Sequence, residues 1–165
     1  MNIYEFAMQM EKDGENYYRQ LARESGTKGL QSIFSMLAAE EVKHYQVVAA
    51  MRDKIRETVL EESSVLDSTW NIFQTMKEQK QPLHIDATEE TEKYRNARDI
   101  ENLSHEFYLE KADQAESEHQ RQIFLQLAAE EAKHLRIMQN IVEFVSRPEP
   151  GQWLENAEWT HLESY

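Results

Sequence analysis

The chain contains an internal repeat with an offset of 90 residues, and this repeat constrains the fold more than any other feature of the sequence. Residues 34–44 read FSMLAAEEVKH and residues 124–134 read FLQLAAEEAKH, so eight of eleven positions are identical. Similar residues also recur upstream of each copy at the same offset. We therefore expect two related halves, at about residues 1–57 and 91–146.

Each half contains two stretches in which apolar residues recur at intervals of three and four, the period of a helix with one buried face. The composition supports helix almost throughout, because 165 residues include only 4 Gly and 3 Pro. Four long helices and one short helix are predicted, at about residues 2–24, 28–57, 68–78, 89–116 and 118–145.

The predicted fold is all-α, a single domain at residues 1–146 that forms an antiparallel four-helix bundle. The connection between the second and third long helices is long enough to cross from one end of the bundle to the other. Prolines and a glycine after residue 147 end the last helix. The C-terminal tail at residues 147–165 is aromatic, so we expect it to dock on its own bundle or on a neighbouring subunit.

Six polar residues interrupt the apolar faces of the four long helices. Four of them are carboxylates, which would repel one another and would each carry a desolvation cost of several kcal/mol if buried without a partner. The apolar faces contain no Lys or Arg that could pair with them, so a bundle held together by buried ion pairs is the less favoured alternative. Two divalent metals meet the requirement, in a pattern described for di-iron and di-manganese carboxylate bundles. The candidate ligands are Glu11, Glu41, His44, Glu101, Glu131 and His134.

The spacing within each Glu-x-x-His motif presents both side chains to the same metal pair, because residues i and i+3 share one face of a helical turn. One such motif alone is weak evidence, but two copies at equal offset, each with another glutamate upstream, are much stronger. The expected arrangement has Glu41 and Glu131 bridging the metals, Glu11 and His44 completing one, and Glu101 and His134 completing the other.

Residues near these candidates have two interpretations each. Tyr18 and Tyr108 follow a candidate ligand by two turns, where a phenol either hydrogen-bonds a ligating carboxylate or only fills the core. His105 is a possible seventh ligand. Glu40 lies off the apolar face and is expected in solvent.

Segments 11–18 and 101–108, together with the two Glu-x-x-His motifs, resemble the rubrerythrin and ferritin-like di-iron family over about residues 3–145. The resemblance implies a ferritin-like bundle that binds two iron ions, although carboxylate and imidazole ligands also suit Mn or Zn. It further implies reduction of hydrogen peroxide, or of oxygen, and a homodimer or larger homo-oligomer.

Two departures from the family pattern stand out. Rubrerythrins proper carry a C-terminal rubredoxin domain that delivers electrons, but this sequence has no cysteine to hold such an iron. A peroxidase of this kind would need an external electron donor such as a rubredoxin. The family also has an additional glutamate one turn after the third-helix ligand, where this chain has Ser104, so the redox-linked ligand exchange associated with that glutamate is not expected.

Two alternative functions share the same residues: a ferroxidase or iron-storage protein, and a non-enzymatic helical module that metal only stabilises. Other classes are disfavoured. A net charge of −13 does not suit nucleic acid or an anionic membrane surface. No apolar run approaches the roughly 18 residues of a membrane span and no leader is recognisable, so a cytoplasmic protein is expected.

Overall fold

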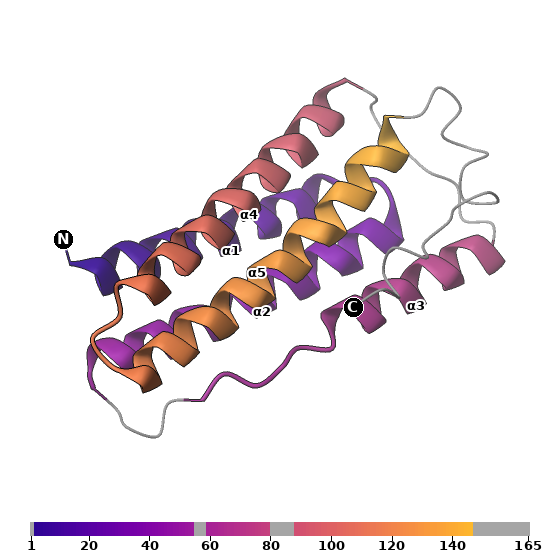
Figure 1. Ribbon diagram of the computed structural model, residues 1–165. Helices are drawn as coiled ribbons and strands as arrows, with labels where there is room; N and C mark the ends of the chain where they lie inside the picture. Colours follow the sequence, from indigo (N-terminus) through magenta and orange to yellow (C-terminus); the bar gives the residue numbers. More distant parts are fainter. Residues whose placement is uncertain (1, 55–58, 80–87, 147–165) are drawn as a thin grey trace.

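The structure is a computed structural model that describes residues 2–54, 59–79 and 88–146 (Figure 1). The described residues form five α-helices and no strand, so the all-α prediction is confirmed. The predicted tail at residues 147–165 lies outside them. The helices are α1 (Ile3–Glu24), α2 (Lys28–Arg52), α3 (Val65–Glu78), α4 (Glu89–Asp113) and α5 (Glu118–Val145).

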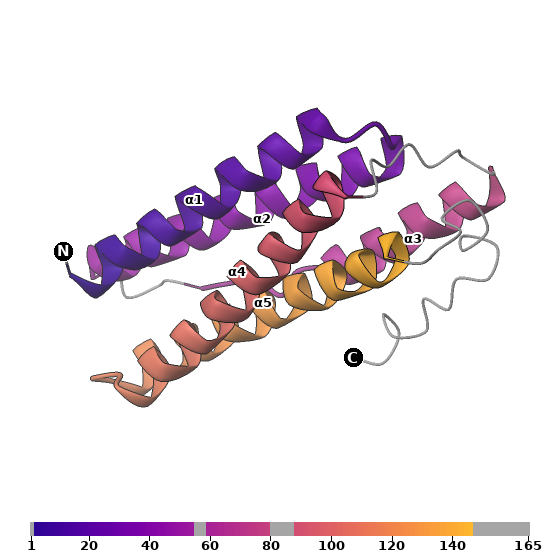
Figure 2. The ribbon, with the colours of Figure 1, turned by 90° about the horizontal axis from the view of Figure 1, so that it is seen from above.

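Four of these helices form two hairpins, α1 with α2 and α4 with α5, which pack against each other as a four-helix bundle (Figure 2). Local capping supports the helix starts. The Asn2 side chain accepts a hydrogen bond from the Glu5 amide at 2.8 Å, and the Ser117 hydroxyl accepts one from the Gln120 amide at 3.1 Å. The two hairpins correspond to the two copies of the sequence repeat.

Two helices end earlier than the predicted limits. We expected the second helix to continue to about residue 57, but α2 ends at Arg52 and Lys54 has a φ of 56°, a left-handed conformation that stops a helix. The fourth helix was predicted to reach residue 116, but α4 ends at Asp113 because the chain must turn before Ser117 caps α5. Residues 55–58 lie outside the described part of the chain.

The crossover between the hairpins carries α3, which packs on α2 and α5 (Figure 1). Phe73 and Met76 are buried in the core, and Trp70 packs against it. The approach to α2 is close, because a Cβ at Gly29 would lie 2.1 Å from the Met76 sulfur. The short helix predicted at residues 68–78 is therefore present, and it begins three residues earlier at Val65.

The core consists of two apolar clusters with a polar layer between them. Along α2, Leu37 belongs to one cluster and Val48 to the other, and along α5, Ile137 and Leu127 are divided in the same way. Both Glu-x-x-His motifs lie between these positions, so the polar residues occupy the middle of the bundle. Each cluster closes one end of this layer and keeps bulk water away from it.

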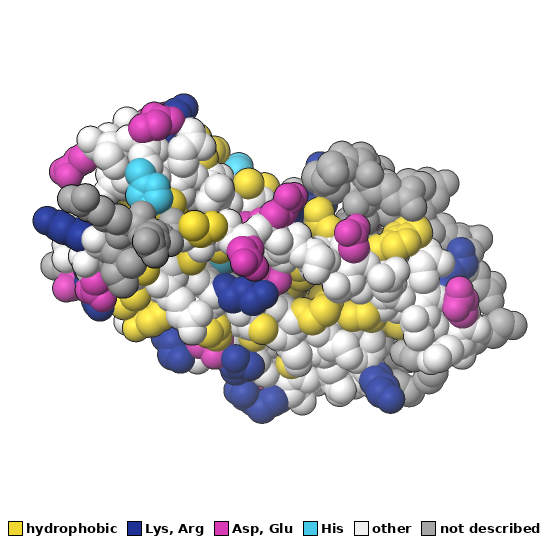
Figure 3. Space-filling view, turned by 90° about the horizontal axis from the view of Figure 1, so that it is seen from below, with side chains coloured by type: hydrophobic (Ala, Val, Ile, Leu, Met, Phe, Trp, Pro, Cys, Tyr) yellow, Lys and Arg dark blue, Asp and Glu magenta, His cyan; other side chains and the backbone are white. Residues whose placement is uncertain are grey.

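None of the described helices is both long enough and apolar enough to span a membrane. The face drawn in Figure 3 intersperses acidic and basic side chains with small apolar areas. This face therefore carries no continuous basic surface of the kind that binds a phosphate backbone.

Candidate metal centre

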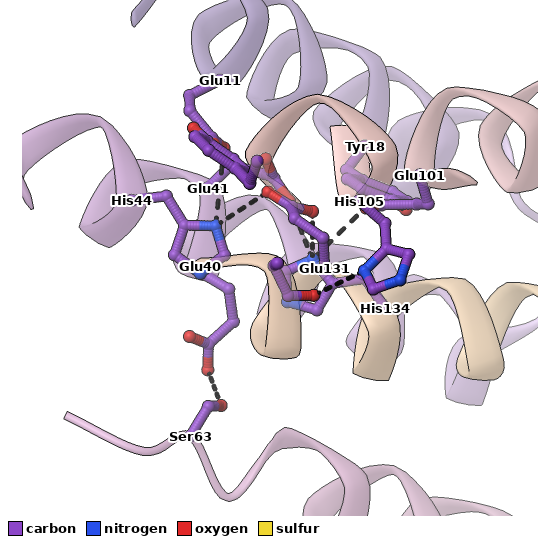
Figure 4. A network of polar contacts seen from close by, with 12 residues as sticks. Glu11, Tyr18, Glu40, Glu41, His44, Ser63, Glu101, His105, Glu131 and His134 are labelled. Carbon is purple, nitrogen blue, oxygen red and sulfur yellow. Dashed lines mark hydrogen bonds and ion pairs between the residues drawn. The ribbon is translucent and has the colours of Figure 1, made fainter. Parts of the chain in front are cut away.

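All four helices of the bundle contribute to the polar layer, which brings the six predicted ligand residues together (Figure 4). None of the six is more than 4% exposed. They are buried because each replaces an apolar residue on the inward face of its helix, which leaves the side chain no route to solvent. α1 provides Glu11, α2 provides Glu41 and His44, α4 provides Glu101, and α5 provides Glu131 and His134.

The six side chains form two groups that each could hold a metal ion. Within each group, one ligand atom from every residue lies within 4.8 Å of the others. Two glutamates belong to both groups, so they could be shared by two metals. The first group is Glu11, Glu41, His44 and Glu131, and the second is Glu41, Glu101, Glu131 and His134.

The hydrogen bonds of the imidazoles cross from one half of the repeat to the other. His44 Nδ1 lies 3.1 Å from a Glu131 oxygen, and His134 Nδ1 lies 2.9 Å from a Glu41 oxygen. The two rings are nearly parallel, with 5.3 Å between their centroids and 10° between their planes. Each motif thus completes its contacts with the motif of the opposite hairpin.

The two tyrosines follow the same pattern. The Tyr18 hydroxyl donates to a Glu101 oxygen at 2.5 Å, and the Tyr108 hydroxyl donates to a Glu11 oxygen at 2.6 Å. In the sequence each tyrosine stands seven residues after the glutamate of its own half, which is about 10 Å along a helix axis. That separation is too long for a hydrogen bond within one helix, so each phenol bonds the glutamate of the other half.

Burial and mutual contact divide the four carboxyls into two pairs. Burial raises the pKa of Glu41 and of Glu131 well above the usual value, and the negative charges of Glu11 and Glu101 add to the effect. Burial also raises the pKa of Glu11, but the charge of His44 and hydrogen bonds from its neighbours outweigh this and lower it to about 2. Without metal, Glu41 and Glu131 therefore keep a proton to higher pH than Glu11 does.

Glu101 behaves like Glu11. Its burial acts to raise the pKa, yet the charge of His134 and the hydrogen bonds from Glu131, His134 and Tyr18 lower it overall. Burial raises the pKa of both tyrosines well above the usual value, and the nearby carboxylates raise it further. Both phenols consequently stay protonated and act as hydrogen-bond donors to the ionised carboxylates.

The donor set fits cations. One oxygen each of Glu11, Glu101 and Glu131 is buried without a hydrogen-bond partner in the described part of the chain. In that part of the chain, the ion-pair partners of the four carboxylates are His44 and His134. Buried carboxylate oxygens without a partner are costly, and divalent metals would satisfy them with the oxygen and nitrogen ligands that iron, manganese and zinc accept.

Gly14 leaves the space that Glu41 occupies. A Cβ at this position would lie 3.0 Å from Glu41 Oε2, a distance that would force the carboxylate to move. The equivalent residue of the second half, Ser104, is also small and is 6% exposed. Both small residues stand one turn after an upstream glutamate and keep the middle of the layer open for the longer side chains.

Two residues lie next to the six candidate ligands: His105 stays outside the groups that could hold metal, and Glu40 is more buried than we expected. His105, the possible seventh ligand, belongs to none of the metal-binding groups of the described residues, and its Nδ1 lies 2.8 Å from the Ala128 carbonyl. The expectation that Glu40 is in solvent is wrong, because its side chain is only 12% exposed. The Ser63 hydroxyl donates to Glu40 at 2.5 Å, so the crossover covers this glutamate. Glu130, the equivalent residue of the second repeat, is also buried, with 4% of its surface exposed.

In a comparison with known protein families, residues 2–100 match the family model described as Rubrerythrin. Neither the curated proteins nor the solved structures include a match to this chain. The matched range covers the first hairpin and ends one residue before Glu101. The corresponding residues of the second hairpin are related to the family through the internal repeat.

Proposed function

The chain belongs to the rubrerythrin family, and on this basis we propose that it is a di-iron protein that reduces hydrogen peroxide, or oxygen, with electrons from an external donor. The single observation that carries the proposal is the pair of buried Glu/His groups that share two glutamates. Bound as Fe(II), the metal pair would supply two electrons, one from each iron, which is what reduction of peroxide to two water molecules requires.

In this proposal the six buried residues hold the two metals. Glu41 and Glu131 belong to both groups and would be shared by the two metals. Glu11 and His44 would help to hold one metal, and the corresponding pair of the second half would help to hold the other. The two tyrosines orient the terminal carboxylates through the hydrogen bonds at 2.5 and 2.6 Å.

The protein also controls protons and water at the centre. Metal binding displaces the protons that Glu41 and Glu131 hold in the metal-free state, because a ligating carboxylate must be ionised. The apolar clusters on either side restrict solvent, which strengthens every electrostatic interaction within the layer. These 165 residues contain no cysteine that could hold a rubredoxin-type iron, so in this proposal the electrons come from outside them.

The test is anaerobic loading with Fe(II), followed by stoichiometric hydrogen peroxide in one sample and oxygen in another. The proposal expects rapid oxidation by peroxide, seen as the absorption of the oxidised centre. Fast reaction with oxygen beside indifference to peroxide would exclude peroxide as the oxidant, and this result is also the one expected of a ferroxidase. A colourless protein that retains zinc and shows no redox response would indicate a metal-stabilised module.

Substitution of the ligands tests their assignment. Glu41→Ala and Glu131→Ala should each lower metal affinity strongly, since both groups lose a shared oxygen ligand. His105→Ala is the matched control, because this half-buried histidine contacts a backbone carbonyl instead of the metal centre. Equal losses of affinity in all three variants would contradict the assignment.

A further inference from the structure

Residues 59–64 of the crossover precede α3, and we refer to them as the strap. Figure 4 shows Ser63 of the strap beside Glu40, at the edge of the metal layer. The contacts of the strap with the layer converge on Ser63. The Ser63 hydroxyl donates to Glu40 Oε1 at 2.5 Å, and the Ser63 amide donates to Glu130 Oε1 at 3.2 Å. Glu40 and Glu130 are equivalent residues of the two repeats, so one strap residue binds the same glutamate in both hairpins.

A contact at the start of α3 determines which way the Ser63 hydroxyl donates. The Val65 amide donates to the Ser63 hydroxyl oxygen at 3.0 Å. The hydroxyl hydrogen is therefore free to point at the Glu40 carboxylate, which is acceptor-only when it is ionised. Ser64, the next residue, makes no side-chain cap contact with the helix.

Glu40 stands beside both candidate ligand imidazoles. One of its oxygens and one ring nitrogen each of His44 and His134 lie within 4.8 Å of one another. Nδ1 of each ring is engaged with a carboxylate of the metal layer. Nε2 of each ring is buried and has no hydrogen-bond partner within the described residues.

This arrangement supplies what a metal-bound imidazole requires. A histidine that binds metal through Nδ1 keeps its hydrogen on Nε2, and metal-ligating histidines almost always donate that second N–H to a carboxylate, a carbonyl or water. Glu40 precedes His44 by four residues on α2, so both lie on the same face of the helix. Glu40 thus lies near the His44 ring on the same helix face, and it would accept from Nε2–H once Nδ1 binds a metal.

The equivalent glutamate of the second half has different surroundings. Glu130 Oε1 accepts from the Ser63 amide and also from the Lys133 ammonium at 3.0 Å, and Lys133 is only 15% exposed. The ammonium of Lys43 lies 3.9 Å from Glu40 and is 64% exposed, so water screens it. The strap crosses the bundle once, and it can offer its hydroxyl to only one of the two repeats.

We propose that Ser63 is a positioning residue of the metal centre, which holds Glu40 as the acceptor for the Nε2–H of His44 and so makes the His44 half of the centre differ from the His134 half. The inference rests on the metal centre proposed above. It adds a residue that belongs to neither repeat and that no ligand pattern in the sequence includes.

The test uses anaerobic titration of the full chain with Co(II), followed by visible absorption and by proton NMR of the exchangeable imidazole N–H resonances. Wild-type protein should bind two Co(II) ions and show two such resonances. Ser63→Ala should weaken one binding step by about 3- to 10-fold, less than the 10- to 100-fold typical of losing a direct partner of a ligand. It should also shift one N–H resonance and leave the other in place.

Three variants complete the experiment. Ser63→Thr retains the hydroxyl and should restore the wild-type behaviour, and Ser64→Ala is the matched control on the same strap. Glu40→Gln removes the carboxylate without touching the strap and should change the same resonance as Ser63→Ala, which keeps the inference testable if Ser63→Ala does not fold.

Several results would overturn the inference. Two unchanged resonances in both Ser63→Ala and Glu40→Gln would do so, as would equal changes in both resonances or an equal effect of Ser64→Ala. Failure of wild-type protein to bind Co(II) would overturn the proposed metal centre itself, and the inference with it.

Discussion

At the scale of single residues, the centre depends on contacts that cross between the two halves. Each imidazole and each tyrosine bonds a glutamate of the opposite hairpin. A single hairpin therefore has the motif but lacks the partners of its own ligands. The site exists only when both hairpins are packed together.

Tyr18→Phe tests the tyrosine contacts. It removes the hydroxyl that donates to Glu101 at 2.5 Å and keeps the ring in the core, so metal affinity should fall by about tenfold. Metal competition titrations would measure the change. Tyr17→Phe is the control, because the Tyr17 hydroxyl donates to the Lys93 carbonyl at 2.9 Å, away from the ligands. A similar loss of affinity in both variants would contradict the orienting role.

Gly14→Ala should separate metal binding from helix stability. Alanine favours a helix over glycine by about 1 kcal/mol, so the metal-free protein should tolerate the change. The new Cβ would lie 3.0 Å from Glu41 Oε2, and moving this carboxylate should lower metal affinity. Thermal melts with and without metal would reveal a smaller metal-induced shift. Asn16→Ala at an exposed position of α1 should leave the shift unchanged.

At the scale of elements, α3 and the strap connect the hairpins and cover one side of the bundle. The helix docks through Phe73, which is 2% exposed, and Met76, which is 1% exposed. The docking also places Ser63 against the two glutamates, since the Val65 amide at the start of α3 binds its hydroxyl. The packing of α3 is thus linked to the positions of these two glutamates beside the metal layer.

Phe73→Ala measures the docking. Removing a fully buried phenylalanine leaves a cavity and should destabilise the fold by about 3–5 kcal/mol, which urea unfolding followed by circular dichroism would detect. Asn71→Ala on the exposed face of α3 should change stability by no more than about 0.5 kcal/mol. An effect of Phe73→Ala as small as that of the control would show that α3 is not docked as described.

At the scale of the whole molecule, pH couples folding to metal. The folded-state pKa values of Glu41 and Glu131 are raised, so their contribution to the stability of the metal-free fold is present below the usual pKa of 4.5 and is lost as pH rises through the raised pKa values. Metal binding displaces these protons. Because fewer protons compete for the carboxylates at higher pH, metal binds more tightly as pH rises. The metal-induced increase in Tm should therefore be larger at pH 8 than at pH 5.5.

Scanning calorimetry of metal-free and metal-loaded protein at the two pH values would measure this difference. Glu11 acts in the opposite direction, because its pKa is lowered to about 2 and its contribution is lost only as pH falls below 4.5. It stays ionised between pH 5.5 and pH 8 and does not affect the comparison. An equal increase at both values would show that no proton is released from the glutamates.

Much of the architecture was predictable because helix periodicity and the repeat are local properties of the chain. The four long helices, their apolar faces and the convergence of the two motifs all follow from residue spacing. Helix ends were less predictable, since the left-handed conformation of Lys54 has no signal in its residue type. The burial of Glu40 was missed because it depends on a crossover segment that no periodicity describes.

The sequence by itself determined that this chain is a duplicated helical bundle with six buried glutamates and histidines that could hold metal, because the spacing of apolar residues and the 90-residue offset assign each side chain to a helix face. Only the tertiary structure decided which half contacts which. Hydrogen bonds between hairpins depend on how two helix surfaces meet in space, so Tyr18 bonds Glu101 instead of Glu11. The same packing brings the strap against α2 and α5, where Ser63 contacts the equivalent glutamates of both repeats, Glu40 and Glu130.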